Sequence, residues 1–301
     1  MSASNRERRA AIARETLDIV AQGHYAADDG RIVEIGAATR ACLVGTRLYL
    51  PHELDALRSR EARVSIGVET AIEVRDEGTL SSAARLASAG FARVGVLNFA
   101  SARHPGGGFE RGSQAQEESL ARSSSLHASL TTAAAAPYYR HHREQASAAY
   151  TDRVIVSPDC PVFRDDDGTL RDRPFLATFL TCAAPNARAM ADNEPEGLAA
   201  LSPLFERRIE AVLTVALDAK CDALVLGAWG CGVFGNDPAM VADAFAAHLG
   251  DAGAFRGAFR RIDFAVLDAS PGKACVAAFE RTFGAIRLDL APCSNCTKNL
   301  K

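Results

Sequence analysis

Two adjacent glutamates, Glu117 and Glu118, follow shortly after a glycine triplet formed by Gly106, Gly107 and Gly108. Glycine has no Cβ atom, so a ligand oxygen can approach the backbone N–H groups of such a triplet closely. One carboxyl group beside that ligand could orient a sugar hydroxyl while the other protonates a leaving oxygen. The same two residues could instead be solvated glutamates that favour the dipole at a helix start. The two side chains alone leave both interpretations open.

A second glycine-rich stretch, residues 227–236, contains Gly230, Cys231, Gly232, Val233, Phe234 and Gly235. Each glycine-rich stretch follows an apolar run, residues 94–100 or 222–226, that is typical of a strand buried on both faces. The carboxyl ends of such strands are where α/β proteins bind ligands, and helix N-termini there favour anions. Either set of glycines could simply make tight turns. Together the two stretches favour a nucleotide-like ligand with a diphosphate.

Residues 230–235 also fit the G-x-G-x-x-G fingerprint of dinucleotide-binding folds. That fingerprint begins its helix within the glycine motif and places an acidic residue about 20 positions later. Here Asp237 and Pro238 predict a helix that begins after the motif, as N-cap and first-turn proline. Asp268 lies too far along the chain to be the acidic residue. The spacing therefore argues against hydride-transfer chemistry.

Strands that alternate with helices predict an α/β domain with a largely parallel sheet covered on both sides. The main predicted strands are residues 70–75, 94–100, 153–156, 175–182, 222–226 and 262–268, and the main helices are residues 79–89, 201–219, 237–249 and 273–283. A helix at residues 6–21 and two short strands precede them. Ser113 and Gln116 match a capping box, which predicts one helix from there until Pro137 ends it.

The chain has 301 residues, of which 48% are hydrophobic and 24% are charged, enough for one large globular domain or one domain with an extension. A formal net charge of -3 does not indicate a basic surface that would bind duplex nucleic acid or an anionic membrane. No apolar run approaches the roughly 18 residues of a membrane span, and the N-terminus lacks the core of a signal peptide. The eight cysteines lack the spacing of a disulfide framework, which is typical of reduced thiols in a reducing compartment. The expected location is therefore the cytoplasm.

No motif completes a metal site. His141 and His142 lie near Glu144 but lack the further ligand that zinc requires. Residues 165–168 lack the rest of a calcium loop and predict a turn. Cys293 and Cys296 form a single C-x-x-C pair in a polar tail.

Taken together, the motifs resemble the signature of bacterial-type poly(ADP-ribose) glycohydrolases. The resemblance rests on residues 98–101, the glycine triplet and the sequence Gln116-Glu117-Glu118, and the second glycine-rich stretch is similar to that family's other phosphate loop. It implies a macrodomain, a three-layer α/β/α fold with a mixed, largely parallel sheet and an N-terminal extension. The chain would then comprise a helical extension (residues 1–65), a catalytic core (66–290) and a polar tail (291–301).

The resemblance also implies roles for individual residues. Glu118 would be the general acid at a ribose–ribose bond, and Glu117 would hold the hydroxyl groups of the distal ribose. The ligand-binding set would comprise Asn98, Gly106, Gly107, Gly108, Gln116, Gly230, Cys231, Gly232, Val233, Phe234 and Gly235. In it Asn98 positions the distal ribose, Phe234 lies against it, and the two glycine stretches hold the diphosphate from either side. No metal and no cofactor are implied.

The compact bacterial type is expected to cut from the chain end and to release ADP-ribose. Its partners would be poly(ADP-ribose) or ADP-ribosylated protein, without duplex nucleic acid or a membrane. The same acid could also remove single ADP-ribose units from proteins. A non-catalytic ADP-ribose-binding macrodomain would keep both glycine stretches without needing the glutamate pair, so the presence of the pair favours an enzyme.

Overall fold

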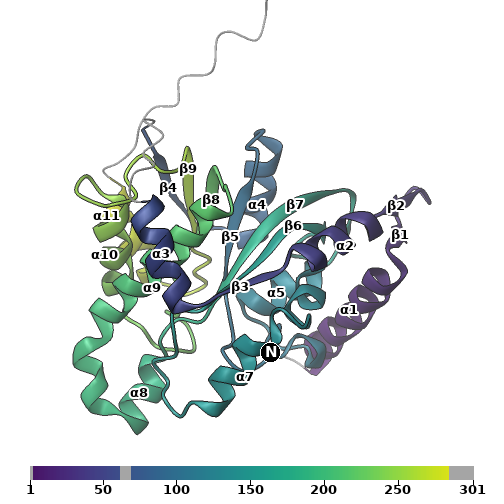
Figure 1. Ribbon diagram of the computed structural model, residues 1–301. Coiled ribbons are helices and arrows are strands. Elements are labelled where there is room, and N and C mark those ends of the chain that lie inside the picture. Colours follow the sequence, from purple (N-terminus) through teal and green to yellow (C-terminus); the bar gives the residue numbers. More distant parts are fainter. Residues whose placement is uncertain (1–2, 62–68, 285–301) are drawn as a thin grey trace, which may run out of the picture.

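The computed structural model describes residues 3–61 and 69–284, and within them a seven-stranded sheet forms the centre of the molecule (Figure 1). In spatial order its strands are β3 (Arg47–Tyr49), β6 (Val154–Arg164), β7 (Leu170–Cys182), β5 (Val94–Phe99), β8 (Ala223–Leu226), β9 (Arg261–Ala265) and β4 (Ala71–Arg75). The pairs from β7 through β4 are parallel, whereas β3–β6 and β6–β7 are antiparallel. The predicted mixed, largely parallel sheet is confirmed.

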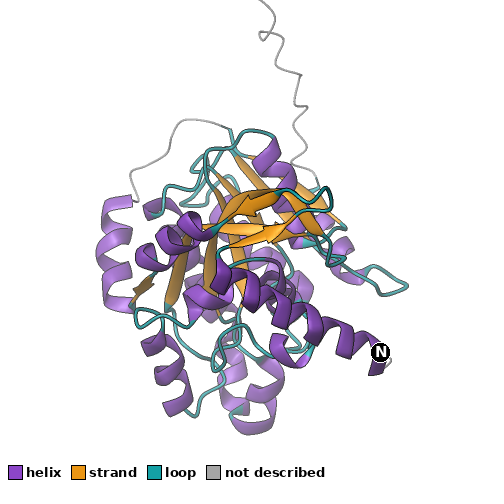
Figure 2. Cartoon of the chain, turned by 90° about the vertical axis from the view of Figure 1, so that its right-hand side faces the viewer, coloured by secondary structure: helices purple, strands orange, loops and turns teal. Residues whose placement is uncertain are grey.

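Helices cover both faces of this sheet and give three layers (Figure 2). One face carries α3 (Pro51–Glu61), α9 (Leu201–Asp218), α10 (Pro238–Leu249) and α11 (Ala274–Phe283). The other carries α2 (Gly36–Gly45), α4 (Thr79–Ser88), α5 (Gln116–Ser123), α6 (Leu126–Leu130) and α7 (Ala136–Glu144). Elsewhere lie α8 (Ala187–Asn193) and the 3-10 helices η1 (Phe109–Arg111) and η2 (Pro195–Ala200). No helix of the described ranges is long and apolar enough to cross a membrane.

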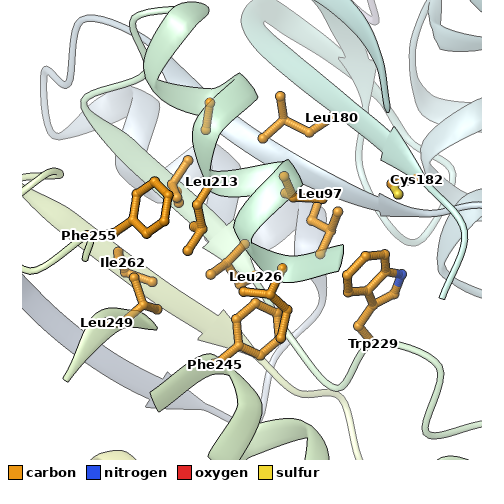
Figure 3. Packing of buried hydrophobic residues seen from close by; sticks show 14 of the residues in the cluster. Leu97, Leu180, Cys182, Leu213, Leu226, Trp229, Phe245, Leu249, Phe255 and Ile262 are labelled. Carbon is orange, nitrogen blue, oxygen red and sulfur yellow. The ribbon is translucent and has the colours of Figure 1, made fainter. Parts of the chain in front are cut away.

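The central strands β5 and β8 are apolar except for Asn98 near the end of β5, because both of their faces are buried. Val96 and Leu97 of β5 and all four residues of β8 have almost no exposed surface. Leu97, Leu226 and Phe245 pack in one cluster, which also contains Trp229 just beyond the end of β8 (Figure 3). The loops at the ends of these strands therefore emerge from closely packed elements.

The expected single helix after the first glycine stretch is wrong. Ala115 rather than Ser113 is the N-cap of α5, and no side chain caps it. The helix ends at Ser123 because Ser124 adopts an extended conformation and bridges to Val162 of β6. Pro137 lies in the first turn of α7, a position that tolerates its missing N–H group. The segment is thus three short helices rather than one.

The N-terminal segment contributes to the main sheet as well as covering it. β3 pairs with β6 at the sheet edge, whereas α1 (Ala3–Gln22) and the hairpin of β1 (His24–Ala26) and β2 (Ile32–Glu34) lie outside the sheet. The predicted boundaries near residues 65 and 290 fall in segments 62–68 and 285–301, outside the described residues. The division into extension, core and tail stays a prediction, and Cys293 and Cys296 also lie outside the described residues.

Candidate active site

The two glycine-rich loops emerge side by side at one edge of the sheet. β5 and β8 are parallel neighbours, with Val96 opposite Val225, and each loop begins at the carboxyl end of its strand. A cleft of about 580 Å³ lies at this edge, a volume within the usual range of small-molecule sites. Six of the predicted site residues line it, namely Gln116, Gly230, Cys231, Gly232, Val233 and Phe234. Its wall also includes Phe99, Ser119, Trp229 and Cys275.

Glu117 is buried at the start of α5, with 3% of its surface exposed. Its Oε2 accepts a hydrogen bond of 2.7 Å from the backbone N–H of Ser101, and Asn98 Nδ2 lies 3.4 Å from Oε1. Burial raises the pKa of Glu117 to about 8, while the Ser101 hydrogen bond opposes that shift. The carboxyl group is therefore held at a fixed position at the end of β5.

Glu118 is half-buried and is held by the first glycine loop. Its Oε1 accepts a hydrogen bond of 3.0 Å from the backbone N–H of Gly108. Gly107, at φ +62°, lies between the two glutamates, and a Cβ atom there would be 3.0 Å from Glu118 Cδ and 3.2 Å from Glu117 Oε2. Only glycine fits this position without displacing a carboxylate.

The first loop uses its backbone N–H groups within the protein. Gly106 donates to the Glu117 carboxylate, Gly107 donates to the carbonyl of His104 at 3.1 Å, and Gly108 donates to Glu118. The triplet thus holds the carboxylates, which differs from the expectation of amides open to a ligand. That the triplet also contacts a diphosphate stays a prediction.

The second loop offers amides that the first loop does not. The backbone N–H groups of Gly232, Val233 and Phe234 have no acceptor among the residues that the structure describes. Gly232 and Val233 are exposed. Successive unpaired N–H groups in a turn form a concave site for an anion. Of the two predicted halves of a diphosphate clamp, the second loop is the one with free donors.

Gly230 and Asn236 hold the two ends of this second loop together. Gly230 has φ +75°, and a Cβ atom there would lie 2.8 Å from Cβ of Ala184. Asn236 donates from Nδ2 to the carbonyls of Gly230 at 3.0 Å and Pro185 at 2.9 Å. Asp237 caps α10, as predicted, by accepting from the backbone N–H of Met240 at 2.9 Å. Asn236 was not among the expected site residues, although it directly follows the last glycine.

Asn98 lies at the end of β5 with no exposed surface. Its Nδ2 reaches Thr181 Oγ1 of β7 at 3.2 Å, whereas its Oδ1 has no hydrogen-bond partner within the described ranges. A buried carbonyl oxygen is normally paired, so an unpaired one at a strand end suits a ligand hydroxyl. Thr181 could not be found from sequence because β7 pairs with β5 across a long separation.

Gln116 joins α5 to the end of β5. Its Oε1 accepts from the backbone N–H of Phe99 at 2.9 Å, and its Nε2 donates to the carbonyl of Leu97 at 2.7 Å and lies 3.3 Å from Thr79 Oγ1. The side chain thereby places the two glutamates that follow it. Its predicted contact with a ligand remains a prediction, although it lines the cleft.

Helix α1 packs against the first glycine loop and the helix that follows it. Arg9 Nε donates to the carbonyl of Gly112 at 2.8 Å, and Thr16 Oγ1 donates to the carbonyl of Arg122 at 2.6 Å. Phe109 in the loop packs with Ala13 of α1. The sequence indicated only a packing helix here, since its apolar spacing does not reveal the partner.

The comparisons with known proteins agree with this geometry. The family model of the microbial-type PARG catalytic domain matches residues 13–165, where PARG denotes poly(ADP-ribose) glycohydrolase. The chain belongs to this PARG family. The matched residues contain the first glycine loop and both glutamates. No curated protein sequence matches the chain.

Solved PARG structures match over nearly the whole chain. PARG from Thermomonospora curvata is 46% identical, with a TM-score of 0.88, covering 92% of this chain and 100% of that one. The same enzyme bound to the inhibitor ADP-HPD gives a TM-score of 0.85 at the same identity and coverage. PARG from Deinococcus radiodurans in complex with ADP-ribose is 44% identical, with a TM-score of 0.79, covering 85% of this chain and 100% of that one. The family and the macrodomain-like fold implied by the motifs are confirmed.

Proposed function

We propose that this protein hydrolyses the ribose–ribose O-glycosidic bonds of poly(ADP-ribose) from the chain end and releases ADP-ribose. Its membership of the PARG family supports the activity. The Deinococcus radiodurans relative binds ADP-ribose, and the Thermomonospora curvata relative binds ADP-HPD. ADP-ribose and its polymer are accordingly the proposed product and substrate.

One observation carries the proposal: two adjacent glutamates, which directly follow the cleft-lining Gln116, are held differently. Glu117 is buried and fixed through both carboxylate oxygens, whereas Glu118 is half-buried and, among the described residues, is hydrogen-bonded through Oε1 only. A fixed carboxyl group suits the binding of ribose hydroxyls. The remaining oxygen of Glu118 is available for proton transfer.

In the proposed reaction Glu118 donates its proton to the ribose oxygen that leaves, and the bond from that oxygen to the anomeric carbon breaks. The transition state resembles an oxocarbenium ion, which negative charge nearby stabilises. Water then adds to the anomeric carbon and its proton returns to the Glu118 carboxylate. The free amides of Gly232, Val233 and Phe234 hold the diphosphate while this occurs.

In this proposal Phe234 contacts the distal ribose. Its ring lines the cleft and packs 6.2 Å from the ring of Tyr150, which in turn meets the His142 ring edge-on at 5.7 Å. Tyr150 has φ 54° although it is not glycine. Aromatic contacts of this kind hold the Phe234 ring in one orientation.

Labelled polymer and, separately, mono-ADP-ribosylated protein test the proposal against its alternatives. We expect ADP-ribose from the polymer at the earliest times, without oligomers of intermediate length. Cleavage of the mono-modified protein alone would favour the single-unit hydrolase, and binding of ADP-ribose without release from either substrate would favour a non-catalytic module. Early oligomers would contradict cleavage from the chain end.

A cytoplasmic location is part of this proposal. Cys42, Cys160, Cys182, Cys221, Cys231 and Cys275 are free thiols in the structure. Free cysteines are typical of a reducing compartment.

A further inference from the structure

Two cysteines from different elements meet on the wall of the cleft. Cys231 belongs to the second glycine loop and Cys275 to the first turn of α11, and both line the cavity. Their side chains are hydrogen-bonded to each other, and both are half-buried. Small oxidants that enter the cleft can therefore reach both sulfur atoms.

The two sulfur atoms are chemically unequal. The hydrogen bond between the two thiols lowers the pKa of Cys275 and raises that of Cys231, whose Sγ also donates to the carbonyl of Trp229 at 3.9 Å. Cys275 also lies at the N-terminus of α11, where the helix dipole favours a thiolate. Asp237 and Asp268 oppose ionisation of Cys275 but do not reverse the shift. Cys275 is thus the better nucleophile.

The other cysteines of the described residues lack this access. Cys42 and Cys160 are also hydrogen-bonded to each other, but they are 1% and 0% exposed inside the core. Cys182 and Cys221 are 0% and 5% exposed. Burial in apolar surroundings keeps a thiol inert. The buried Cys42–Cys160 pair therefore offers a matched control within the same chain.

We propose that Cys231 and Cys275 are a site of oxidation by hydroperoxides, at which a reversible disulfide closes and lowers activity. The Cys275 thiolate attacks one peroxide oxygen and breaks the O–O bond. With hydrogen peroxide this gives a sulfenic acid and hydroxide, which takes up a proton to form water. Cys231 then attacks the sulfenic sulfur and displaces a second water as the S–S bond forms. Two thiols and one peroxide thus yield one disulfide and two waters, and a dithiol reductant reverses the change.

Forming this bond draws the Cys231 side chain towards Cys275 and, in this proposal, moves the second loop with it. A disulfide needs about 2.05 Å between sulfur atoms, which is shorter than a hydrogen bond between thiols. Gly230 and Gly232 flank Cys231 and allow its backbone to shift. The shift carries the free amides of Gly232 and Val233 away from the position proposed for the diphosphate. The loss of activity rests on the proposed function, whereas formation of the disulfide does not.

Peptide mass mapping after brief treatment with hydrogen peroxide tests the bond itself. The experiment uses the full chain with the substitutions Cys293→Ser and Cys296→Ser, which remove the two thiols of the tail. We expect one linked pair of peptides, containing Cys231 and Cys275, which dithiothreitol separates. Oxidation that leaves these two cysteines unlinked would overturn the proposal, and so would a linked pair that contains Cys42 and Cys160 instead.

Activity and ADP-ribose binding of the same samples test the consequence. We expect oxidation to slow ADP-ribose release roughly ten- to hundredfold, the scale of a misplaced binding group, and dithiothreitol to restore it. Each variant is compared with its own reduced form: Cys275→Ser should lose the response to peroxide, and Cys42→Ser should keep it. Full activity of the linked form would overturn the switch. If the reduced protein released no ADP-ribose, the proposed function would be wrong. The peptide mapping would still show whether Cys231 and Cys275 form a disulfide.

Discussion

Gly107→Ala tests whether the first glycine loop and the glutamates share one tightly packed position. The new Cβ atom would overlap Glu118 Oε1 and start 3.0 Å from Glu118 Cδ, closer than the 3.4–4 Å of ordinary van der Waals contact, so the carboxylate must retreat. A misplacement of about 1 Å can slow catalysis on the order of a hundredfold. Alanine at φ +62° also costs about 1–2 kcal/mol of stability.

Gly90→Ala is the matched control, because Gly90 has φ +84° and a Cβ atom there would meet nothing within 4 Å. Thermal unfolding should show the cost of the positive φ in both variants, and a loss of stability in Gly107→Ala at least as large as in Gly90→Ala. ADP-ribose release from the polymer should fall only in Gly107→Ala, with kcat reduced more than binding of ADP-ribose. Unchanged release by a folded Gly107→Ala protein would refute the packing argument.

Three further variants probe the elements around the site. Burial raises the pKa of Glu117 from 4.5 to about 8, so in this pH range the folded state holds a proton that the unfolded state releases. The free energy of unfolding should therefore fall as pH rises from 4.5 to about 8. Glu117→Gln should flatten that fall in urea titrations. Burial lowers the pKa of His142 from 6.5 to about 3, so stability should fall as pH drops below 6.5, and His142→Phe should reduce this acid loss. Gln116→Leu leaves the backbone groups of Leu97 and Phe99 without their side-chain partners. This should lower the free energy of unfolding by about 1–3 kcal/mol in the same titrations, and it should lower kcat. Stability equal to the wild type in that variant would contradict the role of Gln116 in joining α5 to β5.

The local part of the site could be predicted from sequence. The two glycine stretches, the buried strands before them and the cap at Asp237 are each encoded in a few consecutive residues. The parallel pairing of β5 with β8 then brings the loops together at one edge. This is why the order of strands and helices was enough to predict a shared cleft.

Contacts between distant segments could not be predicted in the same way. Ser113 and Gln116 have the spacing of a capping box, but Gln116 instead bonds the backbone of β5, which tertiary structure brings within reach. The amides of the triplet are bonded within the loop or to glutamates that α5 presents to them. The meeting of Cys231 with Cys275 likewise depends on how α11 packs beside the second loop.

Glu118→Gln is the most direct test of the central claim. Glutamine keeps the size of the side chain but cannot donate the proton, and loss of a general acid typically costs about 10²–10⁴-fold in rate. Glu110→Gln is the control, because Glu110 lies in the same loop region with its side chain 60% exposed. The account predicts that Glu118→Gln abolishes release of ADP-ribose from the polymer while calorimetry still detects ADP-ribose binding, and that Glu110→Gln retains both. Near-normal release by Glu118→Gln would contradict it.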